Sequence, residues 1–154
     1  MAYTTIDDPS AYFQTVLWTG NTTAPRNITN DGNSDLKPDL IWGKNRTTGS
    51  TDNMIFDSSR GFDTDGVLNT NSTAAEGYAT TYGYVGAHLT DGFTSTSGGT
   101  NDDNWNEDGA SYVAWQWKAN GGTRVTNTES GNNPGGGYQA NTTCLLYTSD
   151  AADE

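Results

Sequence analysis

One eight-residue stretch, Ser111 to Lys118, constrains the fold of this chain more than any other. Its side chains alternate as they do in a β-strand, where successive residues point to opposite faces. Val113, Trp115 and Trp117 share one face, and an Asn-Gly-Gly run ends the pattern. Because burying a tryptophan stabilises a fold by roughly 2–3 kcal/mol, we predict a strand whose Val113, Trp115 and Trp117 face the core.

A second stretch, residues 38–46, alternates in the same way, with Leu40 and Trp42 on one face and Ile41 on the other. Shorter strand patterns, separated by turns rich in Gly, Asn and Asp, fall at residues 12–19, 26–29, 54–56, 78–85 and 88–95. The last is a predicted hairpin that turns at Asp91-Gly92. The sequence therefore predicts an all-β fold, an antiparallel β-sandwich with long polar loops, and Leu40 and Trp42 on its inside.

The composition agrees with a small aromatic core that carries polar loops. Only 32% of the 154 residues are hydrophobic, but 11% are aromatic, which argues against disorder. The formal net charge of −12 argues against binding to nucleic acid, because phosphate contacts need a basic face. No apolar run approaches the ~20 residues that span a membrane, and no signal peptide is recognisable. A single cysteine excludes an internal disulfide.

The predicted ligand-binding residues lie in the polar loop between residues 97 and 109. Trp105 is flanked there by amides and carboxylates and either stacks on a sugar ring or folds back onto the core. Its neighbours complete the predicted contact set, which consists of Trp105, Asp102, Asp103, Asn104 and Asn106.

Other constellations are weaker, and no catalytic residue or cofactor is predicted. Calcium is an alternative for residues 101–109, but counting from Asp102 the loop has Glu107 where an EF-hand turn needs glycine. A glycosidase would need two carboxylates roughly 5–9.5 Å apart, and Glu76 and Glu107 are the only glutamates before residue 121. His88 has no sequence partner for a triad or a zinc site.

Asp57 and Arg60 are predicted to pair at the end of a strand, as a structural contact.

Several runs, in this order along residues 10–122, resemble a module of bacteriophage tail-fibre and other virion structural proteins, many from marine metagenomes. They are Tyr12–Asn21, Leu36–Trp42, Lys44–Arg46, Asp57-Ser58, Arg60-Gly61, Asn71–Glu76, Asp91–Phe93 and Tyr112–Trp115. The resemblance implies a concanavalin A-like or SPRY-like β-sandwich of jelly-roll type. Gly43 departs from the pattern, since the family tends to carry a larger apolar residue there, and we expect a gap or bulge beside Trp42.

The same resemblance shapes the expected organisation of the chain. We expect a lead-in at 1–10, the sandwich module at 11–120, a Gly/Asn/Thr-rich linker at 121–137 and the start of a truncated second module at 138–143. Residues 144–154 resemble the conceptual translation of a sequencing adapter. On that interpretation Cys144 is not native, and the natural protein continues beyond Thr143.

The resemblance also implies a function, since such modules are thought to serve in host attachment. We expect a non-catalytic part of a virion that contacts a host-surface glycan or other receptor. Other virion subunits would be its partners, and fibres of this kind are commonly homotrimers. A purely architectural spacer and a polysaccharide-degrading hydrolase are the alternatives.

Overall fold

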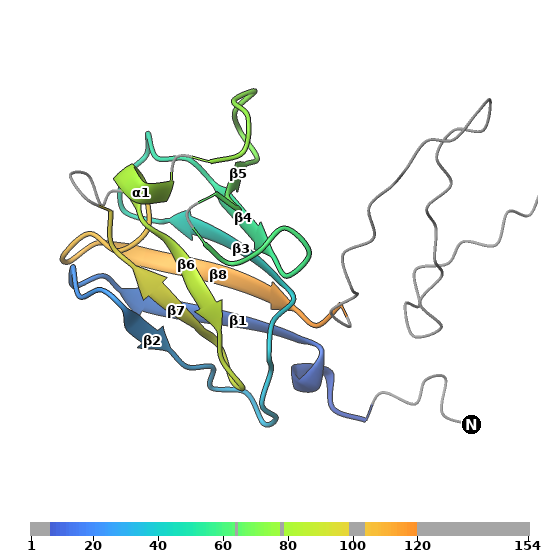
Figure 1. The fold of residues 1–154 in the computed structure, drawn as a ribbon. Coiled ribbons are helices and arrows are strands. Elements are labelled where there is room, and N and C mark those ends of the chain that lie inside the picture. Colours follow the sequence, from blue (N-terminus) through green and yellow to red (C-terminus); the bar gives the residue numbers. More distant parts are fainter. Residues whose placement is uncertain (1–6, 64, 78, 99–103, 120–154) are drawn as a thin grey trace, which may run out of the picture.

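The computed structural model describes residues 7–63, 65–77, 79–98 and 104–119. In chain order the elements are η1 (Pro9–Ala11), β1 (Phe13–Thr19), β2 (Arg26–Ile28), β3 (Leu40–Asn45), β4 (Met54–Asp57), β5 (Leu68–Asn69), α1 (Ala79–Tyr82), β6 (Tyr84–His88), β7 (Phe93–Thr96) and β8 (Ser111–Trp117). The strands form two antiparallel sheets, one in the order β1-β8-β3-β4-β5 and one in the order β2-β7-β6. The smaller sheet lies across β8 and β1 of the larger one (Figure 1). The predicted antiparallel β-sandwich is confirmed.

The core is assembled around Trp105, whose side chain is 0% exposed. The ring of Trp105 meets the rings of Trp18 and Phe56 edge-on, with centroids 5.5 and 5.4 Å apart, and the tilted ring of Phe93 at 5.9 Å. Trp18 also stacks on Tyr112 at 5.2 Å. Both sheets therefore pack against an aromatic side chain that comes from the loop before β8.

Two small residues make room for that indole. Gly43 of β3 and Ala114 of β8 are paired across the sheet and both are buried. A Cβ atom on Gly43 would lie 2.0 Å from Cζ3 of Trp105, so the ring occupies the space that a side chain would need. The gap or bulge expected beside Trp42 is not found, because β3 keeps a regular register with both neighbours through Gly43.

The predicted facing of β8 is wrong. Tyr112, Ala114 and Gln116 point into the sandwich, and the alternate residues Val113, Trp115 and Trp117 lie on the outer face. Val113 is buried there but is not part of the core cluster. Because Trp105 and its aromatic neighbours already fill the interior, a second layer of indoles from β8 does not fit.

The predicted facing of β3 is wrong for the same reason. Ile41 is fully buried, whereas Leu40 is half-buried and Trp42 lies on the outer face, 37% exposed. At the buried end of β8 the side-chain amide nitrogen of Gln116 has a partner, since Nε2 donates a hydrogen bond to Asn30 Oδ1 at 2.5 Å.

The smaller sheet contains the predicted hairpin. β6 and β7 pair around a turn in which Gly92 has a φ of +91° and accepts a hydrogen bond from Leu89 N–H at 2.8 Å. The strand predicted from residue 78 onward is corrected in part, because Tyr82 ends helix α1 and the strand begins at Tyr84. Gly83 separates the two with a φ of +84°, and a Cβ there would meet Cβ of Trp105 at 2.8 Å.

His88 lies at the end of β6, where its ring meets that of Phe62 edge-on at 5.1 Å. Burial, and then the nearby charge of Lys37, lower the pKa of His88 below its usual 6.5. The folded state therefore disfavours the protonated ring. Above pH 6.5 the ring is neutral in both states, and the folded state has its full stability. The free energy of unfolding then falls as the pH drops from 6.5 toward the lowered pKa, because the unfolded state binds the proton more readily.

We therefore expect the denaturation midpoint of the parent protein to fall more steeply between neutral and mildly acidic pH than that of His88→Gln. Urea titrations of both proteins at matched pH values measure the difference. Parallel pH profiles would contradict the prediction.

Candidate functional site

The outer face of the larger sheet gathers aromatic and apolar side chains into two rows. The strand registers place Thr15, Trp115, Trp42, Ile55 and Leu68 in one row. They place Phe13, Trp117, Leu40 and Asp57 in the next. Each row crosses neighbouring strands at the same height, so side chains from distant parts of the sequence become neighbours.

The four large rings of these rows, Phe13, Trp42, Trp115 and Trp117, form what we call the aromatic platform. Trp42 and Trp115 have ring centroids 5.3 Å apart, and Phe13 and Trp117 5.2 Å apart, both pairs tilted. Phe13 is 41% exposed and Trp42 37%, while Trp115 and Trp117 are half-buried. A contiguous apolar patch of this kind marks a binding surface more often than scattered exposed side chains do.

An open pocket of about 470 Å³ adjoins the platform at Leu40 and Asp57. It is lined by Asp39, Leu40, Asp57, Ser58, Ser59, Arg60 and Ala119. Its walls offer carboxylates, hydroxyls and a guanidinium group beside the apolar surface. The pocket can therefore donate hydrogen bonds to a polar ligand and accept them from it.

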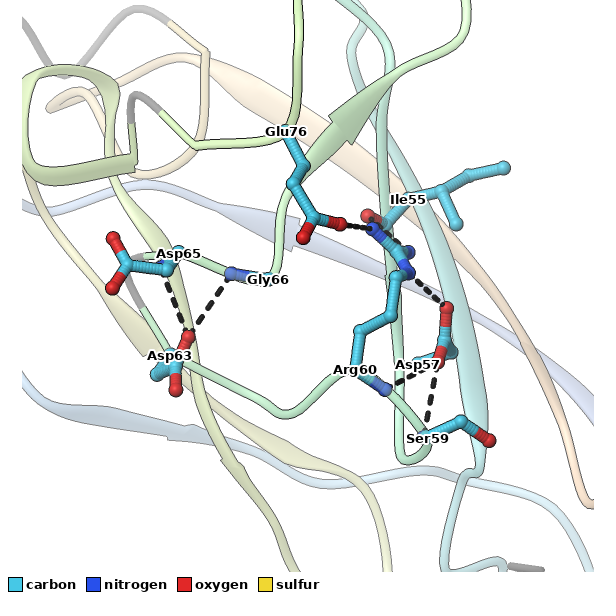
Figure 2. Close-up of polar contacts among 8 residues, drawn as sticks. All are labelled: Ile55, Asp57, Ser59, Arg60, Asp63, Asp65, Gly66 and Glu76. Carbon is cyan, nitrogen blue, oxygen red and sulfur yellow. Dashed lines mark hydrogen bonds and ion pairs between the residues drawn. The ribbon is translucent and has the colours of Figure 1, made fainter. Parts of the chain in front are cut away.

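Arg60 is fixed in this pocket by three partners, as Figure 2 shows. Its Nε contacts Asp57 Oδ2 at 2.6 Å, its Nη1 lies 3.6 Å from Glu76 Oε2, and its Nη2 donates to the Ile55 carbonyl at 3.4 Å. The backbone N–H groups of Ser59 and Arg60 donate to Asp57 Oδ1. The predicted Asp57–Arg60 pair is confirmed, and it holds the pocket wall in one shape.

A family model described as a domain of unknown function, DUF7483, matches residues 8–143. The chain belongs to the DUF7483 family. No curated protein and no solved structure matches it. The DUF7483 match covers every strand of the sandwich and continues through residues 121–143, for which the sequence predicts a linker and the start of a second module.

The predicted contact loop of this DUF7483 domain does not present Trp105 to a ligand. Trp105 takes the second of its two predicted alternatives and is a core residue, so its assignment as an exposed stacking residue is wrong. Asn104 is 6% exposed, and its Oδ1 accepts a hydrogen bond from Asp52 N–H at 3.2 Å. Asn106 is 0% exposed, and its Nδ2 donates to the Thr23 carbonyl at 2.9 Å.

These two amides are therefore structural contacts that secure the loop carrying Trp105. Asp102 and Asp103, the other two predicted contacts, lie outside the described residues.

The acidic turn around Asp63 uses its own carboxylate, and residues 101–103 of the calcium alternative lie outside the described residues. Asp63 Oδ1 accepts hydrogen bonds from the backbone N–H groups of Asp65 and Gly66 at 2.9 and 3.0 Å, so it closes a turn (Figure 2). Among the described residues, no three His, Cys, Asp or Glu side chains are grouped so that they could hold a metal. In the same part of the chain, no helix is long and apolar enough to cross a membrane.

Sequence reasoning missed the aromatic platform of the DUF7483 domain, although its residues belong to the strands that were predicted. A signal was present in the small residues Gly43 and Ala114, which alternate with Trp42 and Trp115. Small side chains on one face leave space for a residue from elsewhere in the chain. That space is taken by Trp105, which leaves the indoles of the strands on the other face.

Proposed function

We propose that this DUF7483 domain is a non-catalytic, tail-fibre-like virion module that attaches to a host-surface glycan through the aromatic platform. The observation that carries the proposal is the solvent-facing set of four rings, assembled from β1, β3 and β8. The resemblance of residues 10–122 to virion structural modules supports the setting. The proposal therefore places the glycan contact on the sheet and not on the loop around Trp105.

The chemistry of the surface suits a sugar chain. A pyranose ring has a face of C–H groups that can lie on an aromatic ring, and a rim of hydroxyls that needs hydrogen-bond partners. Trp42 and Trp115 supply the rings, and the adjoining pocket supplies the carboxylates of Asp39 and Asp57. The fixed Asp57–Arg60 pair reduces the ordering cost of binding.

The extent of the surface favours a ligand over a large protein partner. Phe13 and Trp42 are each less than half exposed and Trp115 and Trp117 are half-buried, so the platform offers only part of four rings. A stable protein interface buries ~800 Å² on each side. A few sugar units match the smaller area better, and each contact is then weak.

Repetition compensates for weak single contacts. Where several copies are held on one particle, the second binding event becomes intramolecular and the overall affinity rises. This agrees with the homo-oligomeric assembly and with the other virion subunits that the resemblance implies as partners.

The test is glycan binding by a multivalent display of the full 154-residue chain, on an array and then on host cells. We expect Trp42→Ala and Trp115→Ala each to weaken binding by about tenfold or more, because each removes a stacking surface. Leu68→Ala, on the same outer face but without a ring, should leave binding nearly unchanged.

The controls separate the alternatives. Asp102→Ala and Asp103→Ala test the remaining predicted loop contacts. A loss of glycan binding confined to these two variants would show that the loop, and not the platform, is the binding site. Absence of binding by the parent display would favour an architectural spacer. Release of reducing sugar from host polysaccharide would favour a hydrolase.

A further inference from the structure

The outer edge of β1 carries backbone groups that no other strand of the sandwich uses. β1 ends the larger sheet and pairs only with β8. Lys118 N–H donates to the Tyr12 carbonyl at 2.9 Å, and Gly20 N–H donates to the Ala110 carbonyl at 2.8 Å. In an antiparallel pair such bonds recur at every second residue, so the even-numbered residues of β1 bond to β8.

The odd-numbered residues of β1 therefore direct their N–H and C=O groups away from the sheet. The Thr19 carbonyl accepts a hydrogen bond from Arg26 Nη1 at 2.5 Å. The backbone groups of Phe13, Thr15 and Leu17 have no hydrogen-bond partner within the part of the chain that the structure describes. Their side chains are exposed, Leu17 by 61%. We call these three residues the β1 edge.

Proteins usually protect such an edge with charge, proline, a bulge or shortness. The other three sheet edges in the described residues are protected. β5 has two residues, β2 has three and begins with Arg26, and β6 has a register shift between Val85 and Ala87. β1 has seven residues in regular register with no proline, and the sequence has no charged residue from 9 to 25. The β1 edge is the one that remains open.

We infer that the β1 edge pairs antiparallel with the β1 edge of a second copy of this chain, around a two-fold axis at Thr15. Phe13 then lies opposite Leu17 of the second copy, and the two Thr15 residues face each other. Aromatic–aliphatic and Thr–Thr pairs of this kind stabilise antiparallel strands. A two-fold axis at Thr15 pairs all three residues of the β1 edge. It leaves out Thr19, whose carbonyl already accepts a hydrogen bond from Arg26.

Charge also selects this edge for a second copy. Two chains with a net charge of −12 repel each other, so contact costs least where both surfaces are neutral. The uncharged segment at 9–25 provides that surface. Screening by salt weakens the remaining repulsion, and we expect the dimer fraction to rise with ionic strength.

The first test measures the mass of the full chain by sedimentation at several protein and salt concentrations. We expect twice the chain mass for the parent and for Leu68→Lys, which places the same charge on the outer face at the opposite edge strand. Leu17→Lys and Thr15→Pro should be monomers, because the first adds charge at the open edge and the second removes an outward N–H. Circular dichroism identifies any variant that fails to fold. If Thr15→Pro does not fold, the mass of Leu17→Lys alone decides between dimer and monomer.

The second test measures register by disulfide capture in a Cys144→Ser background, which removes the single cysteine of the 154-residue sequence. Two Thr15→Cys residues would have Cα atoms about 5.5 Å apart, within disulfide range. Two Leu17→Cys residues would be four positions out of register, roughly 13 Å apart. We expect covalent dimers from the first and none from the second.

Several outcomes would overturn the inference. These are a monomer at every concentration, a trimer or dimer that persists in both edge variants, and capture through Leu17→Cys instead of Thr15→Cys. Pairing of the edge with an extended segment of another protein, while the chain alone stays monomeric, would also overturn it.

Discussion

Replacing Trp105 with alanine is expected to lower the free energy of unfolding by about 3–5 kcal/mol. The indole is 0% exposed and contacts rings from both sheets, including Trp18 and Phe93. Its removal leaves a large cavity at a point where neighbouring strands cannot collapse without losing their own pairing. Urea denaturation followed by circular dichroism measures the loss.

Trp42→Ala is the matched control for this prediction. The same chemical change is made on the outer face, where Trp42 is already 37% exposed, and the expected loss of stability is much smaller. If the two variants were equally stable, or if Trp105→Ala abolished glycan binding at full stability, Trp105 would not be the core residue described above.

Gly43→Ala is expected to destabilise the fold by about 1–3 kcal/mol, although it adds a single methyl group. The new Cβ would lie 2.0 Å from Cζ3 and 2.4 Å from Cη2 of Trp105. Neither the sheet nor the buried ring can yield by more than an ångström without disturbing the contacts of Phe56. The midpoint of chemical denaturation should fall at an unchanged m-value.

Gly49→Ala provides the comparison, because a Cβ at Gly49 would meet no atom within 4 Å. We expect its stability to stay within about 0.5 kcal/mol of the parent. Equal effects of the two substitutions would show that the contact with the indole does not determine the cost at Gly43.

The sequence locates the strands better than it orients them. The predicted segment 12–19 contains β1 at Phe13–Thr19, and the segment 38–46 contains β3 at Leu40–Asn45. Alternation and turn residues are local signals, so they mark where strands begin and end. A period of two does not say which face is buried, because a strand with apolar residues on both faces satisfies either orientation.

The candidate site was not predictable for the same reason. A loop tryptophan between acidic and amide residues has the composition of an exposed contact, and only its fit over Gly43 shows that it belongs to the interior. Once Trp105 fills the core, Trp115 and Trp117 must lie on the outside. The platform therefore follows from a contact between β3 and a loop some sixty residues later in the chain, which no local pattern contains.

The loop before β8 supplies the central core side chain, Trp105, so its sequence can vary less than that of most loops. Insertions, deletions or reshuffled residues around Trp105 would displace the indole and unfold the domain, whereas ring-for-ring changes on the outer sheet would leave the fold intact. On the proposed attachment function, new receptor preferences should therefore arise by changes along the strands. That is the reverse of antibodies, in which a constant sandwich carries variable loops.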